Sequence, residues 1–260
     1  MAAYYNENDA YAAQWLRNLV RANLIAPGDV DERSIVDVRA DDLRNYAQCH
    51  FFAGIGGWSL ALRLAGWPDD RPVWTGSCPC QPFSLAGHQK GQDDSRHLWP
   101  VWLDLIRECR PPIIFGEQVA SAIAQGWLDE VAIDLEGQDY AVAAAVLPAC
   151  AIDALHRRDR LWFVADAFSR GPQGIRAPAE EPWSWEQFER LLSAEARLAI
   201  PAGQDSALAD GIPGRMGQLR AYGNAIVPQV AATFIEAVMT HSPISSQGRP
   251  VPGDKGDCQS

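Results

Sequence analysis

A short apolar run at residues 49–53 ends in the sequence Gly54-Ile55-Gly56-Gly57, and a helical pattern at residues 58–65 follows directly. This order predicts a strand, a glycine turn and a helix. Because glycine has no side chain, such a turn lets the backbone approach a ligand closely, and the helix N-terminus favours polar or anionic groups. The same turn also occurs without a ligand, and a dinucleotide is another occupant. The feature therefore predicts an α/β fold and leaves the ligand open.

Strand and helix patterns alternate along much of the chain. Further strands are predicted at residues 34–38, 73–75, 113–115, 140–147 and 161–165, and helices at residues 11–25, 98–109, 185–198 and 227–238. Such alternation favours a doubly wound, mostly parallel sheet.

The composition fits one α/β domain with a small appendage, because 260 residues with 47% hydrophobic side chains can bury a substantial core. No apolar run approaches the roughly 20 residues that span a bilayer, so we expect a soluble intracellular protein. The six cysteines show neither paired CxxC spacing nor high density. We therefore expect free thiols, with no disulfide and no structural zinc.

The formal net charge of −11 opposes binding to the phosphate backbone of nucleic acids. The acidic side chains are concentrated in the first part of the chain. Residues 1–155 carry 21 acidic and 11 basic side chains, whereas residues 156–260 carry 12 and 11. If nucleic acid binds, we expect the second part to face it, through Arg157, Arg158, Arg160, Arg170, Arg176, Arg215 and Arg220.

Cys80 lies in a loop with two prolines that directly follows the predicted strand at residues 73–75. The carboxyl end of a strand is where ligands bind in such sheets, although an isolated cysteine is often only a small buried hydrophobe. We assign that second role to Cys78, which would point away from Cys80 in an extended loop.

Three charged residues lie at the ends of other predicted strands. Glu117 follows the strand at residues 113–115, so its carboxylate is expected at the same edge of the sheet. Arg158 and Arg160 precede the strand at residues 161–165, and strand alternation would point both to one side. Each of the three is equally compatible with a surface ion pair.

Together these segments resemble the DNA cytosine-C5 methyltransferase family. Its motifs are a Phe-x-Gly-x-Gly-Gly cofactor turn, a Pro-Cys-Gln nucleophile loop, a Glu-Asn-Val carboxylate, a Gln-x-Arg-x-Arg strand and a Gly-Asn-x-x-x-Pro helix start. The chain has, in this order, Phe52 to Gly57, Pro79-Cys80-Gln81, Glu117-Gln118-Val119, His156 to Arg160 and Gly223 to Pro228. Gln118 and His156 replace the usual Asn and Gln. The resemblance covers roughly residues 50–165 and 215–238.

The resemblance implies a Rossmann-like, S-adenosylmethionine-dependent methyltransferase that acts on a flipped cytosine in double-stranded DNA, without a metal, and releases S-adenosylhomocysteine. Cys80 would be the thiolate that adds to C6 of the base. Glu117 would act at N3 and Arg160 at O2, with Arg158 supporting the loop. The implied cofactor residues are Phe52, Gly54, Ile55, Gly56, Gly57, Pro79, Leu98, Asn224 and Ile226.

The motifs that bind ribose and adenine in this family are missing from their usual place. Only 22 residues separate Gly57 from Cys80, too few for two further strand–helix units. The N-terminus, however, is similar to the ribose motif, so we expect a permuted order. Residues 4–6 would form an edge strand and residues 34–38 the next strand outward, with Glu7 at the ribose and Asp37, or alternatively Asp29, at the adenine amine. An acidic surface N-terminus is the alternative.

The resemblance also implies a division of the chain. Residues 1–167 would form the catalytic and cofactor-binding domain, residues 168–215 a reduced target-recognition insert, residues 216–240 a helix that completes the domain, and residues 241–260 a disordered tail. The short insert leaves the target sequence open and is compatible with a partner subunit for target recognition. An RNA cytosine-C5 methyltransferase and an impaired cofactor- or DNA-binding homologue remain alternatives. We expect a cytoplasmic, nucleoid-associated protein of a bacterium or phage, with a role in restriction-modification.

Overall fold

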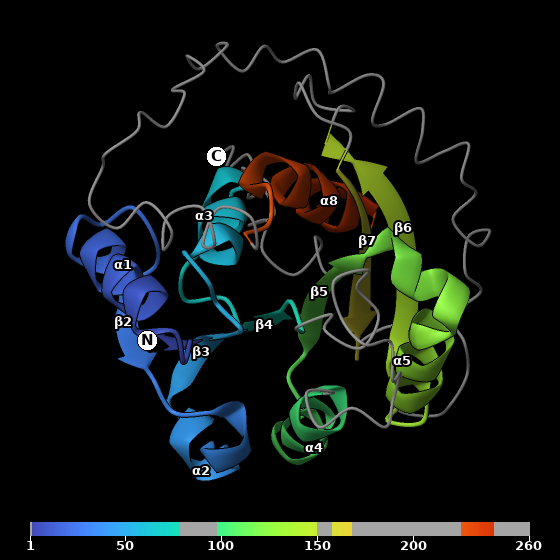
Figure 1. Cartoon of the computed structure of the whole chain (residues 1–260), viewed down its shortest axis with the longest axis horizontal. Helices are drawn as coiled ribbons and strands as arrows, with labels where there is room; N and C mark the ends of the chain where they lie inside the picture. Colours follow the sequence, from blue (N-terminus) through green and yellow to red (C-terminus); the bar gives the residue numbers. More distant parts are fainter. Residues whose placement is uncertain (1, 79–97, 150–157, 168–224, 242–260) are drawn as a thin grey trace, which may run out of the picture.

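The computed structural model describes residues 2–78, 98–149, 158–167 and 225–241, which form a seven-stranded sheet in the order β2-β1-β3-β4-β5-β7-β6 (Figure 1). The strands β1 to β5 run parallel, whereas β7 is antiparallel to both β5 and β6. The predicted Rossmann-like, mostly parallel fold is confirmed. The strands span Ala2–Asn6 (β1), Gly28–Asp31 (β2), Tyr46–Phe51 (β3), Val73–Gly76 (β4), Ile113–Val119 (β5), Ala141–Pro148 (β6) and Asp159–Asp166 (β7).

Helices cover both faces of the sheet. One face carries α1 (Ala10–Arg21), α3 (Gly57–Leu64) and α8 (Pro228–His241), and the other carries α2 (Ala40–Leu43), α4 (Trp99–Cys109) and α5 (Trp127–Glu136) (Figure 1). Two 3-10 helices, η1 (Ile35–Asp37) and η3 (Ala120–Gln125), lie in the connections. This arrangement leaves the carboxyl ends of β1, β3, β4 and β5 along one edge, where ligands bind in open α/β sheets.

Large aromatic side chains fill the two main cores. Beneath α3 and α8, the core contains Trp58, Phe115, Trp162 and Phe234. Beneath α4 and α5, it contains Trp99, Trp102, Trp127 and Phe163. Because side chains alternate along a strand, neighbouring residues of β5 and of β7 enter different cores. A smaller cluster lies under α1.

The N-terminal part differs from the prediction in two ways. The outermost strand is Gly28–Asp31 and not residues 34–38, where Ile35–Asp37 forms η1. The strand β1 lies between β2 and β3 and is therefore not an edge strand. Apolar pattern misled the prediction, because an edge strand paired through its backbone needs few apolar side chains. The helix α1 ends at Arg21, earlier than predicted, and the sequence reasoning missed α5.

Some predictions concern segments that the structure leaves undescribed: the insert at residues 168–215 with its helix at residues 185–198, and the tail from residue 242 onward. Among the described cysteines, Cys49, Cys78 and Cys109 are free thiols, as expected. Within the described ranges, no helix combines the length and apolar character needed to cross a membrane.

Candidate active site at the carboxyl ends of the strands

The glycine turn after β3 requires its glycines for two different reasons. Gly54 and Gly56 have φ angles of 55° and 84°, in the left-handed region that disfavours residues with a Cβ atom. Gly57 begins α3, and a Cβ atom added there would lie 2.6 Å from Cγ1 of Ile226. Ile226 comes from the late segment that resembles the family's Gly-Asn motif. The fold therefore brings two predicted cofactor residues from distant parts of the chain into direct contact.

Glu7 lies directly after β1 and reaches the glycine turn. Its Oε2 atom accepts a hydrogen bond from the backbone N–H of Gly54 at 2.8 Å, and its Oε1 atom accepts one from the N–H of Asp9 at 2.8 Å. Asp9 in turn caps α1 by accepting from the N–H groups of Tyr11 and Ala12. Each carboxylate oxygen of Glu7 retains acceptor capacity for a further donor, such as a ribose hydroxyl.

The segment after β2 is fastened to the end of β1. Asn6 donates a hydrogen bond from Nδ2 to the carbonyl oxygen of Arg33 at 2.9 Å. The Arg33 guanidinium pairs with Asp31 at 2.7 Å and with Asp42 at 2.9 Å, which ties β2 to α2. Two hydrogen bonds lower the pKa of Asp42. The larger effect comes from the backbone N–H of Arg39, and the smaller one from the side chain of Arg33. The polar network fixes the path of the loop that contains η1.

The two candidates for adenine differ in their surroundings. Asp37 is exposed and lies in η1, in the loop beyond the carboxyl end of β2. Asp29 lies within β2, opposite Tyr4 in the parallel register, and accepts a hydrogen bond from the hydroxyl of Tyr46 at 2.8 Å. Of the two, Asp37 is therefore the one whose position, beyond the carboxyl end of β2, suits contact with a ligand.

Glu117 is buried, with 8% of its surface exposed, and lies inside β5 opposite Trp162 of β7, not after the strand as predicted. Its Oε1 atom lies 2.7 Å from Nε of Arg160, and its carboxyl group also forms a hydrogen bond with Ser77. Burial raises the pKa of Glu117, and the charge of Arg160 offsets this in part. The carboxyl group therefore keeps its proton to higher pH than an exposed glutamate.

Arg158 and Arg160 make different hydrogen bonds, and the charges of both act on Glu117. Arg160 lies within β7 and pairs with Glu117. Arg158 precedes the strand with a φ angle of 31°, which breaks the extended alternation, and donates a hydrogen bond to the carbonyl oxygen of Ala225 at 2.5 Å. Burial lowers the pKa of Arg158, and the charge of Arg160 adds to this effect. Arg158 thus fastens the segment that leads to Ile226.

Three residues that the sequence reasoning did not select hold the start of the cysteine loop. Gln118 donates a hydrogen bond from Nε2 to the carbonyl oxygen of Cys78 at 3.4 Å, and its Oε1 accepts from the N–H of Val119. Trp58 donates from its indole N–H to Ser77 Oγ at 3.0 Å. Only Gln118 carried a signal, because it stands in place of the family's Asn. Cys78 is buried, as predicted, and burial raises the pKa of its thiol.

Three predicted site residues, Pro79, Cys80 and Asn224, lie outside the described residues. Of the other cofactor candidates, Phe52 contacts Trp102 edge-on with ring centroids 6.4 Å apart, and Ile55 is half-buried in the glycine turn. Leu98 is the half-buried residue directly before α4. In the described ranges, no group of three or more His, Cys, Asp or Glu side chains is arranged to hold a metal ion.

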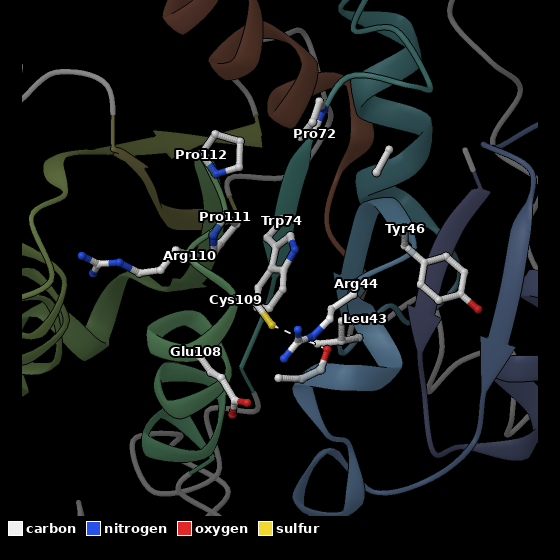
Figure 2. Close-up of a pocket in the computed structure, with 12 residues that line it drawn as sticks. Leu43, Arg44, Tyr46, Pro72, Trp74, Glu108, Cys109, Arg110, Pro111 and Pro112 are labelled. Carbon is white, nitrogen blue, oxygen red and sulfur yellow. Dashed lines mark hydrogen bonds between the residues drawn. The ribbon is translucent and has the colours of Figure 1, made fainter.

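A pocket of about 370 Å³ lies at the amino ends of the central strands, opposite the candidate site (Figure 2). Its lining includes Tyr46 at the start of β3, Pro72 just before β4 and Pro112 just before β5. Figure 2 shows two more of its lining residues, Arg44 directly after α2 and Cys109 at the end of α4. Because ligands in open α/β sheets bind at the carboxyl ends of strands, this amino-end pocket is separate from the candidate site.

Comparison with known proteins finds similar sequences in one family. Residues 67–190 match the model of the C-5 cytosine-specific DNA methylase family. The type II methyltransferase M.AplI of Arthrospira platensis is 30% identical over 54% of this chain and 47% of its own length. The type II methyltransferase M.HhaI of Haemophilus parahaemolyticus is 26% identical over 61% of this chain and 60% of its own length. The chain thus spans about half the length of the curated relatives it matches.

The fold also resembles a solved methyltransferase structure. The Entamoeba histolytica methyltransferase EhMeth aligns with a TM-score of 0.50 and 13% identity over 92% of this chain and 98% of that chain. At this identity the likeness concerns the fold. Residues 67–190 are thus similar to the C-5 cytosine-specific DNA methylase family, and both of these curated relatives are named type II methyltransferases.

Proposed function

We propose that this protein is a DNA cytosine-C5 methyltransferase in which Cys80 is the nucleophile. The observation that carries the proposal is the buried pair of Glu117 and Arg160, with 2.7 Å between Oε1 and Nε, beside the strand that leads into the Pro79-Cys80-Gln81 loop. A buried acid with a raised pKa next to a guanidinium is suited to bind a polar edge on which charge develops.

The chemistry of cytosine explains these residue types. C5 of cytosine is a poor nucleophile, so the Cys80 thiolate first forms a bond to C6. Glu117 donates its proton to N3, and Arg160 stabilises the charge that develops on O2. S-adenosylmethionine, when bound, supplies the methyl group that C5 receives. Loss of the C5 proton then breaks the bond between C6 and sulfur and restores the thiolate. Because these atoms are inaccessible within a duplex, the base must be flipped out.

The described residues fit S-adenosylmethionine. The glycine turn places backbone N–H groups at the start of α3, and the carboxylate of Glu7 stands beside it. We propose that Glu7 holds the ribose and Asp37 the adenine amine, with Phe52, Ile55, Leu98 and Ile226 around them and Pro79 and Asn224 completing the site. The strands β1 and β2 precede the glycine-turn strand β3 in sequence, and β1 pairs with β3 in the sheet. This arrangement supports a permuted order of the cofactor motifs.

The proposed substrate is double-stranded DNA, and the arginines after residue 156 would face it. Two relatives are named type II methyltransferases, which supports a role in restriction-modification in the cytoplasm of a bacterial or phage-infected cell. Residues 168–215, alone or with a partner subunit, would select the target sequence.

Bisulfite sequencing of DNA and RNA from cells that express the protein tests the proposal. We expect cytosines in DNA that resist conversion with the wild type and are absent with Cys80→Ser. Resistant cytosines in RNA alone would replace the proposal by an RNA methyltransferase. Resistance in neither nucleic acid, with intact cofactor binding, would identify a binding protein without activity.

A further inference from the structure

Ser77 lies directly after β4 and beside Glu117. The parallel strands β4 and β5 pair Gly76 with Gly116, so Ser77 and Glu117 are the next residues along each chain. A Cβ atom added at Gly76 would collide with Trp102, on the α4 side of the sheet. Alternation therefore turns Ser77 to the opposite face, where α3 packs. On this face its hydroxyl meets both Trp58 and Glu117.

The hydrogen-bond roles in this trio follow from the chemistry of the groups. An indole N–H can only donate, so Ser77 Oγ accepts the bond from Trp58 Nε1 at 3.0 Å. A hydroxyl has a single proton, and that proton remains for the bond with the carboxyl group of Glu117. Trp58 is itself held by its ring contacts with Phe115 and Trp162, at centroid distances of 6.3 and 5.5 Å.

Building on the proposed function, we propose that Ser77 is a positioning residue that, held by Trp58, fixes the orientation of the Glu117 carboxyl group toward the target base. Arg160 fixes the same carboxyl group from the side of β7. A carboxyl group with one partner can rotate, whereas one bonded from β4 and β7 at once has a single orientation. Trp58 directly follows Gly57, so the arrangement joins the first turn of α3 to the acid.

The arrangement also affects the proton of Glu117. A hydrogen bond donated to the carboxylate form favours that form, so Ser77 lowers the pKa of Glu117 against the effect of burial. Among the described residues, the charged groups that act on Glu117 are Arg160 and Arg158. Removal of the Ser77 hydroxyl should therefore raise the pKa of Glu117 further without changing either arginine.

The test compares Ser77→Ala, the conservative Ser77→Thr and Trp58→Phe with the control Ser59→Ala. Ser59 is also a buried serine with side-chain hydrogen bonds, to Tyr5 and to the N–H of Ala26, but it does not contact Glu117. The pKa of Glu117 is measured by NMR on protein with ¹³C-labelled glutamate carboxyl groups, with Glu117→Gln to assign the signal. The pH dependence of kcat and KM is measured in parallel.

We expect Ser77→Ala to raise the pKa of Glu117, to move the alkaline limb of the kcat profile to higher pH and to lower kcat about tenfold at neutral pH, with KM for S-adenosylmethionine nearly unchanged. Ser77→Thr should restore both quantities, Trp58→Phe should reproduce part of the change, and Ser59→Ala should leave the pKa unchanged. An unaltered pKa and alkaline limb in Ser77→Ala, with only a lower melting temperature, would overturn the inference. If the wild type transfers no methyl group, the proposed function fails, and the NMR measurement still decides whether Ser77 controls Glu117.

Discussion

The carboxylate of Glu7 accepts a hydrogen bond from the backbone N–H of Gly54 at 2.8 Å, although 47 positions separate the two residues in the chain. We expect Glu7→Ala to weaken S-adenosylmethionine binding about tenfold or more, because it removes both the proposed ribose acceptor and a hydrogen bond to the glycine turn. Calorimetric titration measures this change, with Glu32→Ala as the control because Glu32 pairs with Arg17 at the surface. An unchanged dissociation constant would refute the role of Glu7 in the permuted site.

Deletion of residues 1–40 should abolish cofactor binding. The deletion removes β1, which lies between two other strands, so loss of folding is expected together with loss of binding. Circular dichroism of the shortened chain would report the first effect. Retention of cofactor binding by this variant would contradict the assignment of the N-terminal segment.

The proposed mechanism requires the thiolate of Cys80. Cys80→Ser should lower methyl transfer by orders of magnitude and leave cofactor affinity nearly intact, because no other nucleophile adds to C6. Cys78→Ser should have a mild effect, since Cys78 is a buried thiol to which the proposed mechanism assigns no role. DNA that contains 5-fluorocytosine should form a stable covalent adduct with the wild type, visible by denaturing electrophoresis. An active enzyme that forms no such adduct would rule out the mechanism.

The pH dependence of methyl transfer should reflect the burial of Glu117. Burial raises the pKa of this acid, so the protonated form, which the proposed mechanism uses, persists above the usual range of a glutamate and is lost as pH rises through the raised value. Activity should therefore fall on the alkaline side. Glu117→Gln should remove this limb and lower kcat by about a hundredfold or more, because an amide donates a hydrogen bond but no proton. A limb that persists in Glu117→Gln belongs to another group.

The contact between Gly57 and Ile226 predicts an effect that a second substitution should relieve. Gly57→Ala places a methyl group 2.6 Å from Cγ1 of Ile226, and overpacking of this kind costs about 1–3 kcal/mol. The double variant with Ile226→Ala should recover part of the stability and of the cofactor affinity. Gly137→Ala, at the end of α5, is the matched control. Thermal unfolding and calorimetry measure both quantities, and equal losses in the single and double variants would argue against the contact.

DNA binding should depend on arginines after residue 156 and weaken steeply with salt. Arg215→Ala or Arg220→Ala should reduce the slope of affinity against salt concentration, because each removes one contact to a phosphate. Fluorescence anisotropy with a labelled duplex at several salt concentrations gives the slope. Binding that responds neither to salt nor to these substitutions would place the DNA on another face.

Sequence pattern was most informative where strands are buried on both faces. The runs around Ile114 and Phe163 were recognised because parallel and central strands need continuous apolar side chains. The strand Gly28–Asp31 was missed because it lies at the edge of the sheet and carries two aspartates, whose roles are to bind Tyr46 and Arg33. Its partner, β1, was found only through the resemblance of Glu7 and its neighbours to a ribose motif.

The candidate site was likewise predicted in part and missed in part. Motifs selected Glu117 and Arg160 as candidates, because the proposed chemistry needs an acid and a guanidinium, and the structure places the two side chains 2.7 Å apart. Ser77 and Trp58 gave no signal, since their roles depend on the pairing of β4 with β5 and on the packing of α3, which local sequence does not encode. The hydrogen bond from Arg158 to the carbonyl oxygen of Ala225 gave no signal either, because it depends on contact between segments 67 positions apart in the chain.

The packing of α8 against α3 has a consequence for how the chain folds during synthesis. The strands β1, β2 and β3 all lie within the first 51 residues, so their pairing partners are present early in synthesis. The cover over Phe115 and Trp162, in contrast, comes from Phe234 of α8, near the end of the chain. Until that helix emerges, the nascent protein exposes an aromatic surface, and we expect this face to be where chaperones bind and where truncated chains aggregate.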